Sequence, residues 1–267
     1  MTRVAILGAG VMGGAVLSAL LRSGRPPADI VLSDRMVEPT RELAQQHGVV
    51  SAPAAEAAQH ADIVVLAVKP QDMPDLLATI HASIGTETLV ISVAAGISTE
   101  YLENRLPANT GVVRVMPNTP AQVDQGMSIL SAGRHCTPKH LAQAEELLAT
   151  FGRVLILDEK HQHAATAISG SGPAYIFYVT EAMIEAGVLL GLPRQTATEM
   201  VVQTLYGAAT MIRETGEHPS ILREQVSSPG GTSVAALRQL EDHKVRAAFL
   251  TAIEAAARRS QELSEGD

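Results

Sequence analysis

The sequence predicts an α/β domain built on a parallel sheet, followed by a second region made only of helices. Short apolar, β-branched runs alternate with helical segments over residues 1–158, as is typical of parallel strands joined by crossover helices. A glycine-rich turn follows the first of these runs. After Glu159 no strand pattern is visible, and long helical segments continue to the end of the sequence. We therefore expect one domain over 1–158 and another over 159–267.

The first strand is predicted over Val4 to Leu7, and the glycine-rich turn comes directly after it. Gly8, Gly10 and Gly13 match the pattern G-x-G-x-x-G. In this pattern the first glycine allows a tight turn, the second lets a pyrophosphate approach bare backbone, and the third lets the helix pack closely on the strand. The helix that follows, from Val11, offers unpaired N–H groups and the positive end of its dipole to phosphate.

A second strand, Ile30 to Ser33, is followed by Asp34, about 20 residues beyond Gly13. At this distance the acidic residue of a Rossmann unit contacts the adenosine ribose. The strand, the glycine turn, the helix and the acid agree with one another, so together they predict a Rossmann-type dinucleotide-binding domain. The alternative is a strand-to-helix turn that binds no ligand.

The rest of the first domain continues the same alternation. We expect helices at about 38–47, 54–59, 73–82, 99–104 and 139–151, and strands at 62–68, 88–93, 111–115, 126–131 and 154–157. The 62–68 run is apolar throughout, as suits a strand covered on both faces, and Pro70 prevents it from continuing. The strand ends at Gly8, Asp34, Lys69, Ala94 and Met116 should share the carboxyl edge of the sheet, where ligands bind in such folds.

In the second region we expect helices at about 171–190, 194–215, 219–223, 233–241 and 244–262. The loop Val226 to Ser233 contains two glycines flanked by hydroxyls and runs directly into a helix, which is the design of a carboxylate or phosphate site. An ordinary N-capped loop would use the same residue types. The segment 174–192 is apolar enough to suggest a membrane span, but Glu181 and Glu185 near its middle favour a buried helix.

The composition excludes some classes of function. The formal net charge of −8 argues against nucleic acid as the main partner, and we expect no membrane partner either. The single cysteine, Cys136, cannot form an internal disulfide, and the first apolar run is strand-length rather than a signal peptide, so we expect a cytoplasmic protein. Aromatic residues make up only 3% of the chain, so the core must be built from Ala, Val, Leu, Ile and Met, a mild indication of close helix–helix packing between subunits.

Four further stretches, in the same order along the chain, closely resemble the pyrroline-5-carboxylate reductases: Ala67–Gln71, Val113–Pro120, Ser169–Tyr175 and Leu222–Leu237. With the glycine turn they cover nearly the whole chain. The resemblance implies NAD(P)H-dependent reduction of the cyclic imine Δ1-pyrroline-5-carboxylate to L-proline, the last step of proline biosynthesis. It also implies that the all-α C-terminal region is a substrate-binding and dimerisation domain that interlocks with a second copy, with five such dimers often forming a decamer.

The resemblance further implies a set of site residues. The substrate carboxylate would be held by backbone amides around Gly230, Gly231 and Thr232. Glu159 matches an acidic position near the substrate, where it would orient a water molecule or the ring nitrogen; the alternative is a solvated charge at the domain joint. The hydroxyl of Ser233, where the family has threonine, would reach the ring nitrogen as the catalytic group. The expected cofactor-binding residues are Leu7, Gly8, Ala9, Gly10, Val11, Met12, Gly13, Ser33, Asp34, Arg35, Ala67, Val68, Lys69, Pro70, Ala94, Ala95, Gly96 and Asn118.

The choice of cofactor depends on two neighbouring residues with opposite effects. Arg35 could pair with the 2′-phosphate of NADPH, whereas Asp34 would repel that phosphate and favour the free ribose hydroxyls of NADH. We expect NADPH, with NADH possible. Ala54, where many members carry asparagine, removes one hydrogen bond on the adenine side. His161 and His163 form an H-x-H pair, but no cysteine or carboxylate cluster completes a metal site, so we expect no metal.

Two alternative functions remain open at this stage. One is a β-hydroxyacid dehydrogenase-like two-domain reductase, which usually carries a catalytic lysine on a helix of its second domain, and 174–192 contains none. The other is a non-catalytic NADP-binding sensor, which would have no need for the carboxylate cradle of the 226–233 loop. Sequence alone leaves open whether dimers or decamers form, whether related cyclic imines are reduced, and which subunit supplies each site residue.

Overall fold

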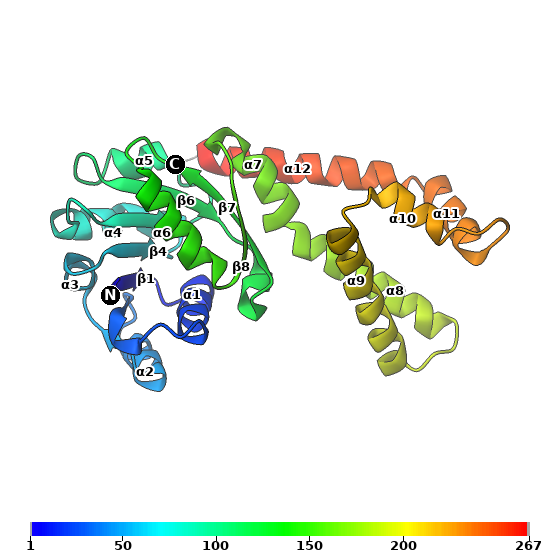
Figure 1. Ribbon diagram of the computed structural model, residues 1–267, viewed down its shortest axis with the longest axis horizontal. Coiled ribbons are helices and arrows are strands. Elements are labelled where there is room, and N and C mark those ends of the chain that lie inside the picture. The colour runs from blue at the N-terminus through cyan, green and yellow to red at the C-terminus, as the bar shows by residue number, and fades with distance from the viewer. Residues whose placement is uncertain (1, 266–267) are drawn as a thin grey trace. The chain divides into compact units, whose positions relative to one another are not determined.

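The computed structural model describes residues 2–265, and its contacts divide the chain into two compact units (Figure 1). The first unit runs up to Ser171 and takes in the chain from Ala256 onward, and the second is Gly172–Ala255. The sequence-based boundary at Asp158 follows the last strand, whereas the first unit extends further. The end of the last helix belongs to the first unit because it contacts residues of that unit. For example, Ser260 Oγ lies 3.1 Å from His163 Nδ1.

The first unit is built on an eight-stranded sheet with the order β3-β2-β1-β4-β5-β6-β7-β8. The strands are β1 (Val4–Leu7), β2 (Ile30–Ser33), β3 (Val50–Ser51), β4 (Ile63–Leu66), β5 (Leu89–Ser92), β6 (Gly111–Met116), β7 (Gly126–Ala132) and β8 (Gly152–Ile156). The order reverses between β1 and β4, at the switch point where a doubly wound sheet opens a crevice. The α/β, Rossmann-type prediction is confirmed.

Two features of the sheet differ from the expectation. The two-residue strand β3 was not expected, because it is too short and too exposed to leave an apolar run in the sequence. Strand β7 pairs antiparallel to β6, whereas the other neighbouring strands pair in parallel. The connection between β6 and β7 holds only a short 3₁₀ helix, Thr119–Val123, and this is too short for the crossover that a parallel pair requires.

Helices cover both faces of the sheet. They are α1 (Val11–Arg22), α2 (Val37–His47), α3 (Ala54–Gln59), α4 (Met73–Ile80), α5 (Thr99–Glu103), α6 (Pro138–Ala149) and α7 (Gln162–Ala165). Alternate residues of β1 enter different cores, since Val4 and Ile6 pack with α1 and α6 while Ala5 and Leu7 pack with α3 and α4. This double burial explains why the strands read as continuous apolar runs.

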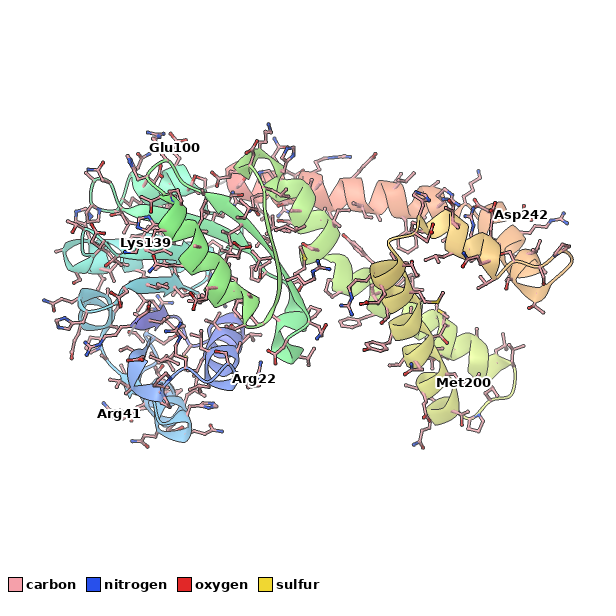
Figure 2. All side chains as sticks on the ribbon, in the orientation of Figure 1. Arg22, Arg41, Glu100, Lys139, Met200 and Asp242 are labelled. Carbon is pink, nitrogen blue, oxygen red and sulfur yellow. The ribbon has the colours of Figure 1, made fainter. Side chains whose placement is uncertain are left out.

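The second unit contains α8 (Gly172–Leu189), α9 (Arg194–Thr215), α10 (Pro219–Gln225), α11 (Thr232–Asp242) and part of α12 (Val245–Glu265). Helices α8 and α9 pack closely, because a Cβ added to Gly187 would lie 2.8 Å from the Cβ of Ala197. Figure 2 shows side chains projecting from these helices, including Met200 on α9, which is 55% exposed. Across residues 2–265, no helix is long and apolar enough to cross a membrane.

Candidate functional site

A cleft of about 730 Å³ opens at the carboxyl ends of β1, β2 and β4, on both sides of the switch point. This is the sheet edge at which the sequence predicted the cofactor. Nine of the predicted cofactor residues line the cleft, namely Leu7, Gly8, Gly10, Ser33, Asp34, Arg35, Ala67, Val68 and Lys69. The opposite wall is formed by residues from the first turns of α4 and from the stretch between β3 and α3, including Ala54.

The three glycines of the turn have distinct geometric roles. Gly8 has a φ of +112°, and a Cβ there would lie 2.6 Å from the carbonyl of Ala67. A Cβ on Gly13 would lie only 1.8 Å from the carbonyl oxygen of Gly8, so the turn and α1 can approach only without a side chain. Nothing lies within 4 Å of the corresponding position at Gly10, which is the N-cap of α1. Open space beside bare backbone at a helix N-terminus is what a pyrophosphate requires, so this turn fits the phosphates of a dinucleotide.

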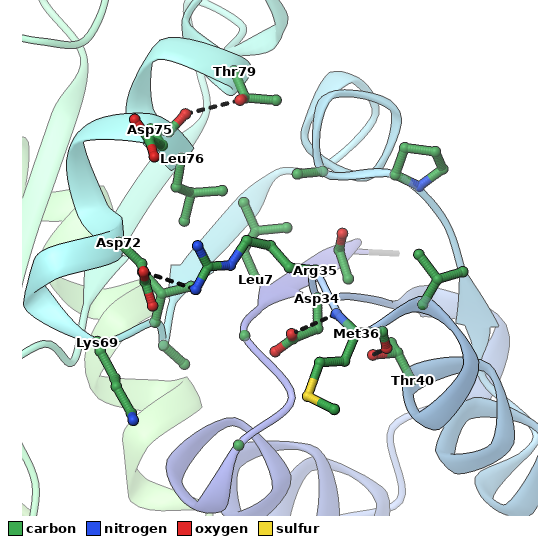
Figure 3. Close-up of a pocket in the computed structure, with 18 of the residues that line it drawn as sticks. Leu7, Asp34, Arg35, Met36, Thr40, Lys69, Asp72, Asp75, Leu76 and Thr79 are labelled. Atoms are coloured by element: carbon green, nitrogen blue, oxygen red, sulfur yellow. Dashed lines mark hydrogen bonds and ion pairs between the residues drawn. The ribbon is translucent and has the colours of Figure 1, made fainter.

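Asp34 joins the glycine turn to the loop that follows β2. Its Oδ2 accepts a hydrogen bond from the backbone N–H of Ala9 at 2.7 Å. Its Oδ1 accepts one from the N–H of Met36 at 3.1 Å, which Figure 3 marks with a dashed line. These two bonds fix the carboxylate at the end of β2, where it lines the cleft. A carboxylate oxygen can accept more than one hydrogen bond, so Asp34 retains capacity for a ribose hydroxyl.

Arg35 forms an ion pair with Asp72, with 2.8 Å between Arg35 Nη2 and Asp72 Oδ1 (Figure 3). The arginine comes from the loop after β2, and the aspartate stands in the short 3₁₀ helix Pro70–Asp72, just before α4. The Arg35 side chain is 75% exposed, whereas that of Asp72 is only 22% exposed. Sequence reasoning did not single out Asp72, because its partner is distant in the chain and only the fold brings the two loops together.

The remaining predicted cofactor residues lie close to the cleft or at the next strands along the sheet. Ala9, Val11, Met12 and Gly13 belong to the turn and the start of α1, and Pro70 follows Lys69. Ala94, Ala95 and Gly96 follow β5, and Gly96 lines a smaller hollow of about 370 Å³ rather than the cleft. Asn118 follows β6, where its side chain donates to the carbonyl of Ser169 at 3.0 Å and accepts from the N–H of Met127 at 2.8 Å.

Glu159 lies beside the smaller hollow with its carboxylate already bound. One oxygen accepts from the N–H of Thr99 at 2.8 Å and from Arg114 Nη1 at 3.1 Å, and the other accepts from the hydroxyl of Thr99. Arg114 is almost fully buried on β6, so Glu159 balances its charge. Arg114 was not predicted as part of this site, although an arginine within the apolar run 112–115 is a signal that a buried charge needs a partner.

The 226–233 loop lies in the second unit, between α10 and α11. Gly230 has a φ of +69°, and Gly231 is the N-cap of α11, so this position has no side chain with which to cap the first turn. The N–H of Gly231 donates to the carbonyl of Ser228 at 2.9 Å and is therefore used within the loop. The N–H groups of Thr232 and Ser233, in the first turn of α11, have no intrahelical acceptor and are the backbone donors that an anion would meet here.

The other reactive residue types do not add a further centre. Within residues 2–265, no group of three or more His, Cys, Asp or Glu is placed to hold a metal ion. Cys136 donates its S–H to the carbonyl of Val112 at 2.9 Å, and burial raises the pKa of its thiol. A partly buried thiol with a raised pKa is a poor nucleophile.

Comparisons with known proteins agree with this arrangement. A family described as "Pyrroline-5-carboxylate reductase dimerisation" matches residues 159–263, and one described as "NADP oxidoreductase coenzyme F420-dependent" matches residues 3–96. A pyrroline-5-carboxylate reductase from Corynebacterium melassecola is 45% identical, over 99% of this chain and all of the relative. Two solved structures each match over 98% of both chains: a reductase of this name from Coxiella burnetii (TM-score 0.92, 35% identity), and a pyrroline carboxylate reductase with NADP bound from Plasmodium falciparum (TM-score 0.89, 28% identity).

Proposed function

The chain belongs to the pyrroline-5-carboxylate reductase family, and on that basis we infer that it reduces Δ1-pyrroline-5-carboxylate to L-proline with NAD(P)H. It is an oxidoreductase, and the reaction is the last step of proline biosynthesis. The full-length similarity to enzymes of this name carries the inference. The cleft is consistent with it, because the open position at Gly10 accommodates the pyrophosphate of a dinucleotide.

We propose that the cleft of the first unit binds the dinucleotide. Bound NAD(P)H supplies the hydride that reduces the carbon–nitrogen double bond of the imine. The N–H groups at the start of α1 would hold the phosphates, and Asp34 would accept a hydrogen bond from the adenosine ribose. Residues 94–96 and Asn118 are proposed to lie along the nicotinamide side, since they follow the next two strands of the sheet.

We propose that the loop before α11 holds the substrate. The N–H groups of Gly230, Thr232 and Ser233 would bind its carboxylate, with Gly231 providing the bare backbone that lets the carboxylate approach. The hydroxyl of Ser233 would donate a hydrogen bond to the ring nitrogen and so increase the electrophilicity of the imine carbon. Because the reactants need little covalent assistance, their orientation is the main contribution that the protein can make.

The structure supports a different role for Glu159 from the one expected. With its carboxylate engaged by Thr99 and Arg114, we propose that it positions the loop after β5 rather than a water molecule or the substrate nitrogen. The N–H and hydroxyl of Thr99 belong to the first residue of α5, which follows that loop. The role is indirect, because Glu159 acts on the protein and not on the reacting atoms.

The decisive experiment is steady-state oxidation of NADPH and of NADH, run in parallel with Δ1-pyrroline-5-carboxylate. Turnover with either cofactor is expected. Folded protein that binds dinucleotide but shows no turnover with either would overturn the assignment, and hydroxyacid substrates would then test the β-hydroxyacid dehydrogenase alternative. That alternative is not favoured by the comparisons, and neither is a non-catalytic sensor.

Self-association is supported by the match to a dimerisation family and by the surface of α8. This 18-residue helix is strongly apolar, yet none of its residues is buried in the single chain, and Phe177 and Tyr178 are 66% and 75% exposed. Apolar surface of this kind indicates a subunit interface. We propose a dimer formed by residues 159–267, with a decamer of five dimers as a further assembly. We also propose that the protein acts in the cytoplasm. Light scattering coupled to gel filtration distinguishes the mass of a dimer from that of a decamer.

A further inference from the structure

Asp72 directs its carboxylate away from its own helix. It is the last residue of the 3₁₀ helix Pro70–Asp72, which continues directly into α4, and its own backbone is helical. Its side chain makes no hydrogen bond to the first turn of α4, and its Oδ1 pairs with Arg35 Nη2 at 2.8 Å. The carboxylate is thus directed across the cleft to the loop after β2 (Figure 3).

The partner of Asp72 is the residue on which binding of a 2′-phosphate would depend. In Rossmann domains an acid at the end of the second strand binds the ribose 2′-hydroxyl, while a nearby arginine accommodates a 2′-phosphate. Asp34 and Arg35 stand at that place, and Asp34 is held there by Ala9 and Met36. A 2′-phosphate entering this region would meet the Asp34 carboxylate and would find the Arg35 guanidinium already paired with a second carboxylate.

The other arginine that lines the cleft, Arg41, is also paired with a carboxylate. Arg41 lines the cleft and forms an ion pair with Glu38, with 2.8 Å between Arg41 Nη1 and Glu38 Oε1. That pair is highly exposed and links neighbouring turns of α2. Asp72 is different because its side chain is only 22% exposed and belongs to the opposite wall. It is therefore the carboxylate that competes most directly with a phosphate for Arg35.

We propose that Asp72 is a specificity-determining residue that acts through Arg35 and shifts cofactor selection away from NADPH and toward NADH. The proposal rests on the dinucleotide-dependent function proposed above and adds a residue to it. Because Asp72 lies beside Arg35, at the place where the ribose 2′ group would bind, we expect it to change which dinucleotide binds and to leave the chemical step unchanged. NADH, with free ribose hydroxyls, needs only the Asp34 carboxylate and leaves the Arg35–Asp72 pair intact.

The test compares Asp72→Asn with the native protein, using two probes that differ in the 2′-phosphate. Asparagine keeps the shape of the side chain, and Asp72 makes no capping bond that the change could remove, so folding should be preserved. Calorimetry is used to measure the affinity for adenosine 2′,5′-bisphosphate and for 5′-AMP. Because the Arg35 end of the ion pair is 75% exposed, Asp72 is a modest competitor, and we expect the bisphosphate to bind about three- to tenfold more tightly in the variant and 5′-AMP to change by less than about twofold. The ratio of kcat/KM for NADPH to that for NADH should rise by the same factor.

Two controls make the interpretation specific. Asp75→Asn removes the same charge from the same wall of the cleft, but Asp75 is not the partner that Arg35 has in the structure. An equal gain with Asp75→Asn would attribute the effect to overall charge and overturn the proposal. In an Arg35→Gln background, Asp72→Asn should lose its effect, because Asp72 acts through Arg35; a gain that persists there overturns it as well.

The failure of this inference can be told apart from failure of the proposed function. If both probes bind and Asp72→Asn changes neither, the dinucleotide site stands and the role of Asp72 is refuted. If neither probe binds to folded native protein, the dinucleotide site itself is wrong, and the inference falls with it. Both readings come from equilibrium binding, so neither depends on turnover of the imine.

Discussion

Removing the carboxylate of Glu159 should destabilise the protein more than it slows the reaction. Arg114 is only 6% exposed, and Glu159, at 28% exposed, is its partner. Breaking a fully buried pair costs about 3–5 kcal/mol, because an uncompensated charge remains inside. Since Glu159 is partly exposed, water can reach the vacated space, and we expect Glu159→Ala to cost about 2–3 kcal/mol.

The assay is thermal unfolding at one fixed protein concentration, since self-association makes the melting temperature depend on concentration. For a chain of this size about 1 kcal/mol corresponds to roughly 2–4 °C, so Glu159→Ala should lower Tm by roughly 4–12 °C. Glu159→Gln keeps one acceptor oxygen for the Thr99 N–H and for Arg114 but removes the charge that balances Arg114, so it should lose about 1–2 kcal/mol. Its kcat should stay within a few-fold of the native value.

The two residues on either side of Glu159 offer a matched control. Asp158 and Lys160 form an ion pair whose side chains are 76% and 71% exposed, so Asp158→Asn should change stability by less than about 0.5 kcal/mol. The reasoning is refuted if Glu159→Ala melts with the native protein. It is equally refuted if Glu159→Gln keeps its Tm but loses kcat by a hundredfold or more, since the charge would then act on the substrate.

Three further outcomes are expected. Gly13→Ala should abolish dinucleotide binding and lower Tm, because its Cβ would lie 1.8 Å from the Gly8 carbonyl oxygen. Gly14→Ala should fold normally, because nothing lies within 4 Å of its Cβ position. Calorimetry measures dinucleotide binding by both variants, and thermal unfolding measures their Tm. If the Ser233 hydroxyl assists the ring nitrogen, Ser233→Ala should lower kcat for Δ1-pyrroline-5-carboxylate by about 10²-fold, whereas Ser233→Thr keeps a hydroxyl and should retain activity close to the native value. An alanine variant as active as the native protein would exclude that role. Because burial raises the pKa of the Cys136 thiol, its reaction with a disulfide reagent should be slow at pH 8 and should accelerate on unfolding or at higher pH; rapid reaction of the folded protein at pH 8 would contradict this.

Much of the secondary structure of both units followed from local patterns in the sequence. The strands β1 and β2 and the helices α3 and α9 have the predicted bounds, and most of the other predicted elements end within a few residues of the observed ones. These elements are readable because the period of apolar residues and the position of glycine and proline act over a few neighbours. The cleft at Gly8, Asp34 and Lys69 followed as well, since the carboxyl ends of parallel strands share an edge.

Features that join distant parts of the chain were not readable in the same way. The antiparallel strand β7 depends on the length and path of a connection, and the return of the chain from Ala256 to the first unit depends on where a long helix ends. The resemblance places Glu159 near the substrate, which stays a prediction, and only the structure shows that its carboxylate binds Thr99 and Arg114.

The sequence by itself determined which residues form the glycine turn, which acid follows β2, and that a dinucleotide cleft and a second glycine-containing loop before a helix belong to one chain. Only the tertiary structure decided which charges meet, namely Arg35 with Asp72 and Arg114 with Glu159. The physical reason is that helix and strand periodicity is set by neighbours in sequence. The pairing of side chains from separate loops is set by the order and spacing of the strands that carry them.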